Sequence, residues 1–164
     1  MPKKPLSEKL VREKLGEVLS WGEAHADWKA ALAGLEEQKR GLRATGLPHS
    51  PWELLEHVRI AQWDILEFTR DPKHKSPDWP SGYWPPSPAP PDTATWDKSV
   101  KGLFSGIKQM QKLVNDSKIP LDQKLPHGSG QTLLRQILLL EDHNSYHLGQ
   151  FVLVRRALDA WKEN

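Results

Sequence analysis

The chain contains no cysteine and no long uninterrupted run of apolar residues. The absence of cysteine excludes disulfides, thiolate metal ligands and a cysteine nucleophile. The most apolar stretch, LLRQILLL at residues 133–140, is far shorter than the roughly 20 residues that a membrane-spanning helix needs. The N-terminus also lacks the apolar segment of a secretory signal peptide. We therefore expect a soluble, cytoplasmic protein.

The sequence also lacks a strong excess of charge of either sign. It has 23 basic and 21 acidic side chains, a formal net charge of +2, and its one dense basic cluster is the short PKK start. Nucleic-acid-binding proteins usually carry a basic stripe or patch, so we expect no nucleic-acid partner. The length of 164 residues suits one domain, residues 1–164, with a real hydrophobic core.

Four segments have the three- and four-residue apolar spacing of amphipathic helices. The second opens with the clearest start signal, because Ser50, Pro51 and Glu53 form the pattern of a capping box. The first is weakened by glycines, and we expect it to bend or break near Gly22. No alternating strand pattern competes, which predicts an all-α four-helix bundle. The predicted helices cover residues 6–38, 51–68, 92–115 and 131–161.

The connection between the second and third predicted helices, residues 71–92, is long and rich in proline. A solvated linker is one interpretation. Trp79, Tyr83 and Trp84 are unusual in such a linker, and they favour an ordered flap that lies over the bundle. In that case Trp79 and Trp84 are positioned to wall a pocket.

Histidines provide the candidate chemistry. His143 and His147 are four residues apart, so a helix directs both imidazoles to one side. His57 lies on a core-facing stripe of the second predicted helix. Three imidazoles from two helices, with coordination positions left open, are typical of a catalytic metal site. The alternative is that these histidines are packed core residues with hydrogen-bond partners.

The remaining four histidines lie outside this predicted cluster. His25 falls on an apolar stripe, and we expect it in the core or beside the site, with a fourth ligand or an acid/base group as alternatives. His49 lies at a helix entrance, and His74 and His127 lie in loops, so no role is expected for them.

The segments PHSPWELLEHVRIAQWDILEF and LLRQILLLEDHNSYHLGQFVLVRRAL resemble the DinB-like superfamily, which includes YfiT-like and bacillithiol-transferase-like metalloproteins. The resemblance implies an up-down-down-up bundle that is often dimeric and holds a divalent metal. It places the ligands on His57, His143 and His147, with zinc or nickel expected ahead of iron or manganese. Characterised members include thiol-dependent transferases, isomerases and metal-dependent hydrolases.

Further residues around the predicted site are assigned roles in catalysis or binding. Asp64 is a candidate to orient a ligand imidazole or act as a base, and any thiol substrate must arrive as a small cosubstrate because the chain has none. The polar neighbours of the predicted site are Gln62, Asp142 and Gln150, whereas Tyr146 and Arg155 are weaker candidates to bind an anionic substrate group. The tryptophans expected in the core or at a dimer contact are Trp28, Trp52, Trp63, Trp96 and Trp161.

The sequence thus leaves three functional hypotheses. The first is a metal-dependent hydrolase or thiol-dependent transferase that acts on a small molecule. The second is a non-catalytic metal-binding or structural protein of the same fold, whose site is closed by a fourth ligand such as His25. The third is a metal-free bundle that acts through protein contacts.

Overall fold

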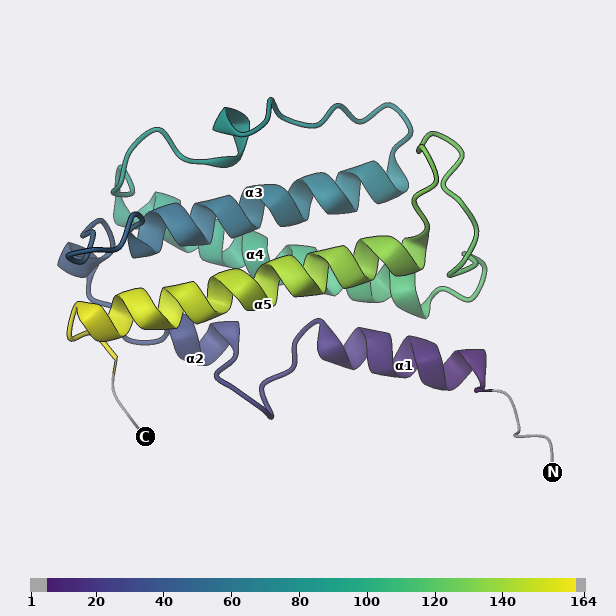
Figure 1. Ribbon diagram of the computed structural model, residues 1–164, viewed down its shortest axis with the longest axis horizontal. Helices are drawn as coiled ribbons and strands as arrows, with labels where there is room; N and C mark the ends of the chain where they lie inside the picture. The colour runs from purple at the N-terminus through teal and green to yellow at the C-terminus, as the bar shows by residue number, and fades with distance from the viewer. Residues whose placement is uncertain (1–5, 162–164) are drawn as a thin grey trace.

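The computed structural model describes residues 6–161 and is all-helical, as the periodicity predicts. Three long helices, α3 (Pro51–Arg70), α4 (Thr93–Asn115) and α5 (Leu133–Ala157), form its centre, and α3 packs against both others (Figure 1). The short helices α1 (Glu8–Val18) and α2 (Trp28–Leu32) pack against α4 and α5, respectively. In Figure 1, α1 and α5 run opposite to α3 and α4. The PKK start lies outside the described residues.

The first predicted helix, residues 6–38, is not continuous. Residues 19–27 are non-helical, so the break predicted near Gly22 is wider than expected, and α2 begins anew. Asp27 causes this restart, because its carboxylate accepts a hydrogen bond from the Ala30 amide and caps α2. Gly34 then adopts a φ of 66° beyond α2, a conformation that favours glycine. A short 3-10 helix, η1 (Glu37–Lys39), follows.

The second predicted helix has the expected start. Ser50 accepts from the Glu53 amide at 3.1 Å, and the Glu53 carboxylate accepts from the Ser50 amide at 2.8 Å, which completes the capping box. The α3 helix extends to Arg70, two residues beyond the prediction, and stops ahead of Pro72.

The last two long helices differ from the prediction mainly at one end. Asp92 caps α4 and Thr132 caps α5 through their side-chain oxygens. The α5 helix ends at Ala157, not at Trp161, since Asp159 adopts a φ of 50° and turns the chain away. Trp161 therefore lies outside the helix, partly buried against Arg155.

The core consists of two apolar clusters along the bundle. One contains Trp28, Trp52, Trp96 and Phe151, and the other is built mainly from aliphatic residues of α3, α4 and α5. The side-chain amides of Gln62 on α3 and Asn144 on α5 are buried between the two apolar clusters, where they hydrogen-bond each other. The stripe predicted for the third helix lies inward, with Trp96, Leu103, Ile107, Met110 and Val114 buried.

The connection at residues 71–92 is ordered and runs back along α3 (Figure 1). It contains the 3-10 helix η2 (Ser81–Tyr83) and contacts α3 through hydrogen bonds, including one from Ser50 Oγ to the Pro88 carbonyl at 2.5 Å. We call residues 71–92 the flap. Within the described part of the chain, no helix has the length and apolar character needed to cross a membrane.

Candidate metal centre

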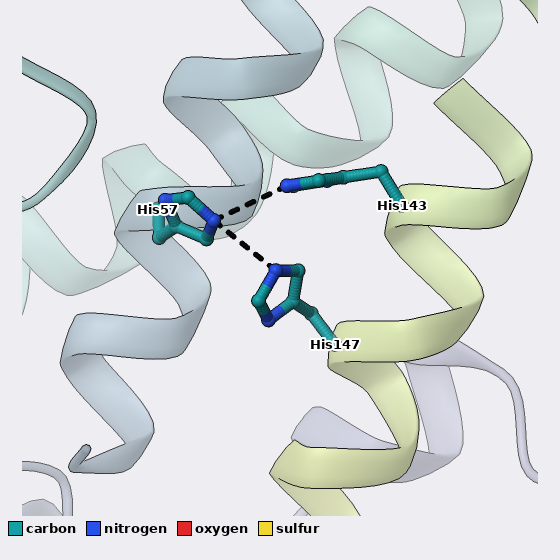
Figure 2. A group of neighbouring side chains, drawn as sticks. All are labelled: His57, His143 and His147. Carbon is teal, nitrogen blue, oxygen red and sulfur yellow. Dashed lines mark hydrogen bonds between the residues drawn. The ribbon is translucent and has the colours of Figure 1, made fainter. Parts of the chain in front are cut away.

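The structure brings the three predicted histidines together from two helices. His57 comes from α3, while His143 and His147 come from successive turns of α5 (Figure 2). The Nε2 atom of His57 lies 3.1 Å from Nε2 of His147 and 3.1 Å from Nε2 of His143. His57 and His147 are buried, and His143 is partly buried.

Hydrogen bonds at the far side of two rings determine which nitrogen carries the proton. Nδ1 of His57 lies 2.9 Å from the Tyr83 backbone carbonyl, which only accepts, so Nδ1 is the protonated nitrogen. Nδ1 of His147 likewise lies 2.8 Å from the side-chain carbonyl oxygen of Gln150. In their neutral forms, both rings therefore direct an Nε2 lone pair at the same point. Two lone pairs 3.1 Å apart repel each other unless a cation lies between them.

Electrostatics keep these imidazoles neutral at ordinary pH. Burial, with smaller contributions from the neighbouring histidines, lowers the pKa of His143 and that of His147 to about 4. Burial also lowers the pKa of His57, partly offset by the hydrogen bond to Tyr83. Because a metal ligand must be a neutral imidazole, all three side chains are in the required state near neutrality.

The donor set fits a divalent transition metal. Imidazole nitrogens bound about 2.1 Å from a tetrahedral zinc lie about 3.4 Å apart, close to the observed spacing of two of the three nitrogen pairs. The three ligand nitrogens all lie within 4.8 Å of one another. Among residues 6–161, no other group of three or more His, Asp or Glu side chains is arranged to hold a metal, and no fourth side chain joins this one. The coordination sphere is therefore incomplete on the protein side.

Trp84 of the flap covers one face of the cluster. Its ring stacks on that of His57, with 3.9 Å between centroids and 4° between planes. His49 stacks on Trp84 as well, at 4.1 Å, so it supports this cover from beside α3. Trp79, the other tryptophan predicted to wall a pocket, is 76% exposed and does not cover the cluster.

Asp64 does not hydrogen-bond any of the three histidines. Its carboxylate instead accepts from the Tyr83 hydroxyl at 2.7 Å and contacts His74 Nε2 at 2.7 Å. Burial and the Asp64 carboxylate raise the Tyr83 pKa to about 12, so the phenol remains a donor. Asp64 thus acts on His57 only indirectly, by anchoring the flap residue whose carbonyl holds Nδ1.

Two sequence-based assignments are wrong. His25 is exposed in the loop before α2, so it is neither a core residue nor a neighbour of the cluster, because the loop interrupts the predicted apolar stripe. Arg155 is not available to a substrate, because its buried guanidinium donates to the carbonyls of Ala31, Ala33 and Ala160.

The polar neighbours divide by position. Gln150 holds His147, and Gln62 is buried in the bundle, where it accepts from Asn144 and donates to the Leu103 carbonyl. Asp142 is exposed, and Tyr146 is 63% exposed with its ring 4.9 Å from that of His147. Of the predicted tryptophans, Trp28, Trp52 and Trp96 are buried, whereas Trp63 is 41% exposed.

Three contributors to the site were not predicted. The Tyr83 carbonyl leaves no sequence signal, because any residue has this group. His49 and His74 were given no role, yet they support Trp84 and Asp64. The sequence indicated these contributions only through the aromatic residues of the flap, which were predicted to lie over the bundle.

A family model described as the DinB superfamily matches residues 20–151. The chain belongs to the DinB superfamily. The match includes α2 to α4, the flap and most of α5, and therefore all three histidines of the DinB cluster. Comparisons with curated proteins and with solved structures gave no match.

Proposed function

We propose that this DinB protein is a metal-dependent enzyme, a hydrolase or a thiol-dependent transferase that acts on a small molecule. His57, His143 and His147 hold the ion in this proposal. The observation that carries it is the opposed pair of Nε2 lone pairs on His57 and His147, each enforced by an acceptor at Nδ1. A closed structural site is less well supported, since His25 lies elsewhere and no other side chain of the described residues replaces it as a ligand.

A divalent ion at these three nitrogens supplies either an acidified water or a site that keeps a substrate thiol deprotonated. The protein's own groups prepare the ligands: the Tyr83 carbonyl and Gln150 hold two rings in the tautomer that presents Nε2. Trp84 covers the face of His57 and excludes water from that side. Any thiol comes from a cosubstrate because the chain contains no cysteine. Zinc or nickel is the expected ion, since both suit imidazole ligands.

A small apolar cavity beside the cluster supports a small-molecule substrate. It has a volume of 110 Å³ and is lined in part by His49, Leu54, Gln150 and Val154. Two of these residues contact the site, because His49 stacks on Trp84 and Gln150 holds His147. This cavity is suited to the apolar part of a substrate whose reacting group lies at the histidines.

The test is metal content, measured by plasma mass spectrometry on tag-free protein. We expect near-stoichiometric metal in the wild type and loss of most of it in His57→Ala and His143→Ala. His127→Ala is the matched control, because the hydrogen bond and the ring contact of this histidine both join it to Phe68, near the end of α3. Wild-type protein that stays metal-free after reconstitution, or His57→Ala protein that retains its metal, would refute the proposal. A positive result justifies assays with small thiols and esters.

A further inference from the structure

A larger cavity lies on the other side of α5 from the histidine cluster. It has a volume of 210 Å³, and α5 contributes Glu141, Asn144, Ser145 and Leu148 to its wall. Helical geometry turns these side chains about 100–160° away from His143 around the α5 axis. The cavity shares no lining residue with the three-histidine cluster. It is therefore a separate feature of the molecule.

Aromatic side chains form much of the wall opposite α5. Trp21 and Trp28 come from the segment that replaces the middle of the first predicted helix, and Phe104 comes from α4. Trp21 is 50% exposed although it is the largest apolar residue type, whereas Trp28 is 6% exposed. Aromatic faces of this kind bind apolar groups and also attract cations.

One polar group of this wall, the Glu141 carboxylate, forms no ion pair with any of the described residues. Ser145 Oγ donates to Glu141 Oε1 at 2.8 Å, and the other carboxylate oxygen has no hydrogen bond within the described residues. Among the described residues, no cationic side chain lies within ion-pair distance of Glu141. A partly buried carboxylate in this position is stabilised by any cation or donor that enters the cavity.

The other charged groups of the wall are already satisfied or face water. The Asp27 carboxylate caps α2. Lys29 and Lys108 line the cavity, but both are exposed, and solvent and salt screen their charges. An anionic ligand would be repelled by the Glu141 carboxylate, and the screened lysine charges would offset little of that repulsion. A volume of 210 Å³ limits the ligand to a small one.

We propose that this cavity is a second ligand site, which binds a small protonated organic amine with its ammonium group on Glu141 and its apolar part against Trp21 and Trp28. The site is independent of the three-histidine cluster. The ammonium group pairs with the free carboxylate oxygen, and the tryptophan faces contribute apolar contact and cation–π attraction.

The experiment uses benzylamine as the probe and benzyl alcohol as its uncharged counterpart of nearly the same shape. Binding to the full-length protein is measured by calorimetry and by tryptophan fluorescence, which reports on the cavity wall. We expect benzylamine to bind at least about tenfold more tightly than benzyl alcohol, the size of a charge-assisted hydrogen bond. No benzylamine binding at millimolar concentration, or equal affinity for the two probes, would overturn the proposal.

Variants assign the binding to the cavity. Glu141→Gln keeps the side-chain shape and should abolish the preference for the amine, whereas Asp142→Asn, which alters the exposed neighbouring carboxylate, should leave it intact. Trp21→Ala should weaken the binding of both probes. Trp21 is half-exposed, so its replacement leaves the buried core intact. An amine preference that survives both Glu141→Gln and Trp21→Ala would place the amine elsewhere. His147→Ala removes a proposed metal ligand and should leave amine binding unchanged, so the two proposals fail separately.

Discussion

Tyr83 connects the flap to the histidine cluster through two different groups of one residue. Its carbonyl accepts from His57 Nδ1, and its hydroxyl donates to Asp64 two helical turns further along α3. The phenol therefore determines where the carbonyl lies, and the carbonyl determines the tautomer of a proposed ligand. Partners of this kind typically affect metal affinity about 10- to 100-fold when they are lost.

We predict that Tyr83→Phe weakens metal binding by about tenfold, because the flap loses its anchor on Asp64 while the carbonyl itself is retained. The measurement is competition with a chelating dye of known affinity. The chain offers a matched control in its second tyrosine: Tyr146 is 63% exposed, its hydroxyl bonds no described residue, and Tyr146→Phe should leave affinity unchanged. Equal effects of the two substitutions would mean that the phenol of Tyr83 does not position His57.

At this scale, the sequence predicts residues whose role follows from helical spacing. His143 and His147 are four apart, and His57 lies on an inward stripe, so periodicity indicates that all three face the core. That they share one site was implied by the resemblance to the DinB-like superfamily. The same reasoning fails for Asp64 and His25. Asp64 is satisfied by flap residues whose position depends on tertiary packing, and His25 lies where the periodic pattern continues but the helix does not.

At the scale of a single element, the start of α3 combines a local motif with longer contacts. Glu53 closes the capping box and also forms an ion pair with Arg43. Burial alone would raise the pKa of Glu53, but the hydrogen bonds from Arg43 and Ser50 outweigh it, and the pKa is lowered. A carboxyl group whose pKa is lower in the folded state stabilises the fold above its unfolded pKa, and this contribution disappears as pH falls through the folded value.

We therefore predict that Glu53→Gln reduces the free energy of unfolding at pH 7 by about 1 kcal/mol, since the charge-assisted bonds become neutral ones. The difference from wild type should shrink below about pH 4.3, the ordinary glutamate pKa, and vanish at lower pH. Urea unfolding at a series of pH values measures it. Glu37→Gln, at an exposed acidic residue of η1, is the control and should track the wild type throughout. A constant difference down to pH 2 would contradict the assignment.

The elements themselves were predictable to the degree that their signals are local. The capping box of α3 and the inward stripe of α4 appear in the sequence and in the structure alike. The gap between α1 and α2 is less visible, because Trp21 and His25 continue the apolar spacing across residues that are not helical. Asp27, which restarts the helix, is a capping residue inside that pattern, and the prediction from periodicity did not take it into account.

At the scale of the whole molecule, Gln62 joins three helices between the two apolar clusters. Its side chain is 1% exposed, donates from α3 to the Leu103 carbonyl of α4 at 2.7 Å and accepts from Asn144 of α5 at 2.9 Å. The Gly106 backbone makes room for it, since a Cβ there would lie 2.1 Å from Gln62 Nε2. This amide therefore hydrogen-bonds both neighbouring helices, and its partner on α5, Asn144, directly follows His143 in the sequence.

We predict that Gln62→Leu lowers the free energy of unfolding by about 2 kcal/mol, because it leaves buried donor and acceptor groups without partners. Denaturant unfolding measures the change, and Gln123→Leu at an exposed loop position controls for the added apolar group. A Gln62→Leu protein as stable as the wild type would show that the neighbouring groups find other partners.

The assembly of the molecule is predicted from one face of α5. Leu138, Leu139, Tyr146 and Leu153 are 52%, 37%, 63% and 53% exposed, and helical geometry places them within an arc of about 100°. A stripe of large apolar side chains on one helix is typical of a contact surface. A second copy of the chain would cover this stripe with the same stripe, as a two-fold dimer requires.

We predict that the wild type sediments as a homodimer and that Leu153→Glu makes it monomeric, because a charge would be buried against an apolar partner. Sedimentation equilibrium over a concentration series measures the association. Lys112→Glu, on the exposed side of α4, introduces a glutamate away from the stripe and should leave the dimer intact. Since Leu153 also lines the small cavity beside the histidine cluster, dimerisation would cover one side of that cavity. A wild type that remains monomeric at high protein concentration would leave the stripe exposed and rule out this arrangement.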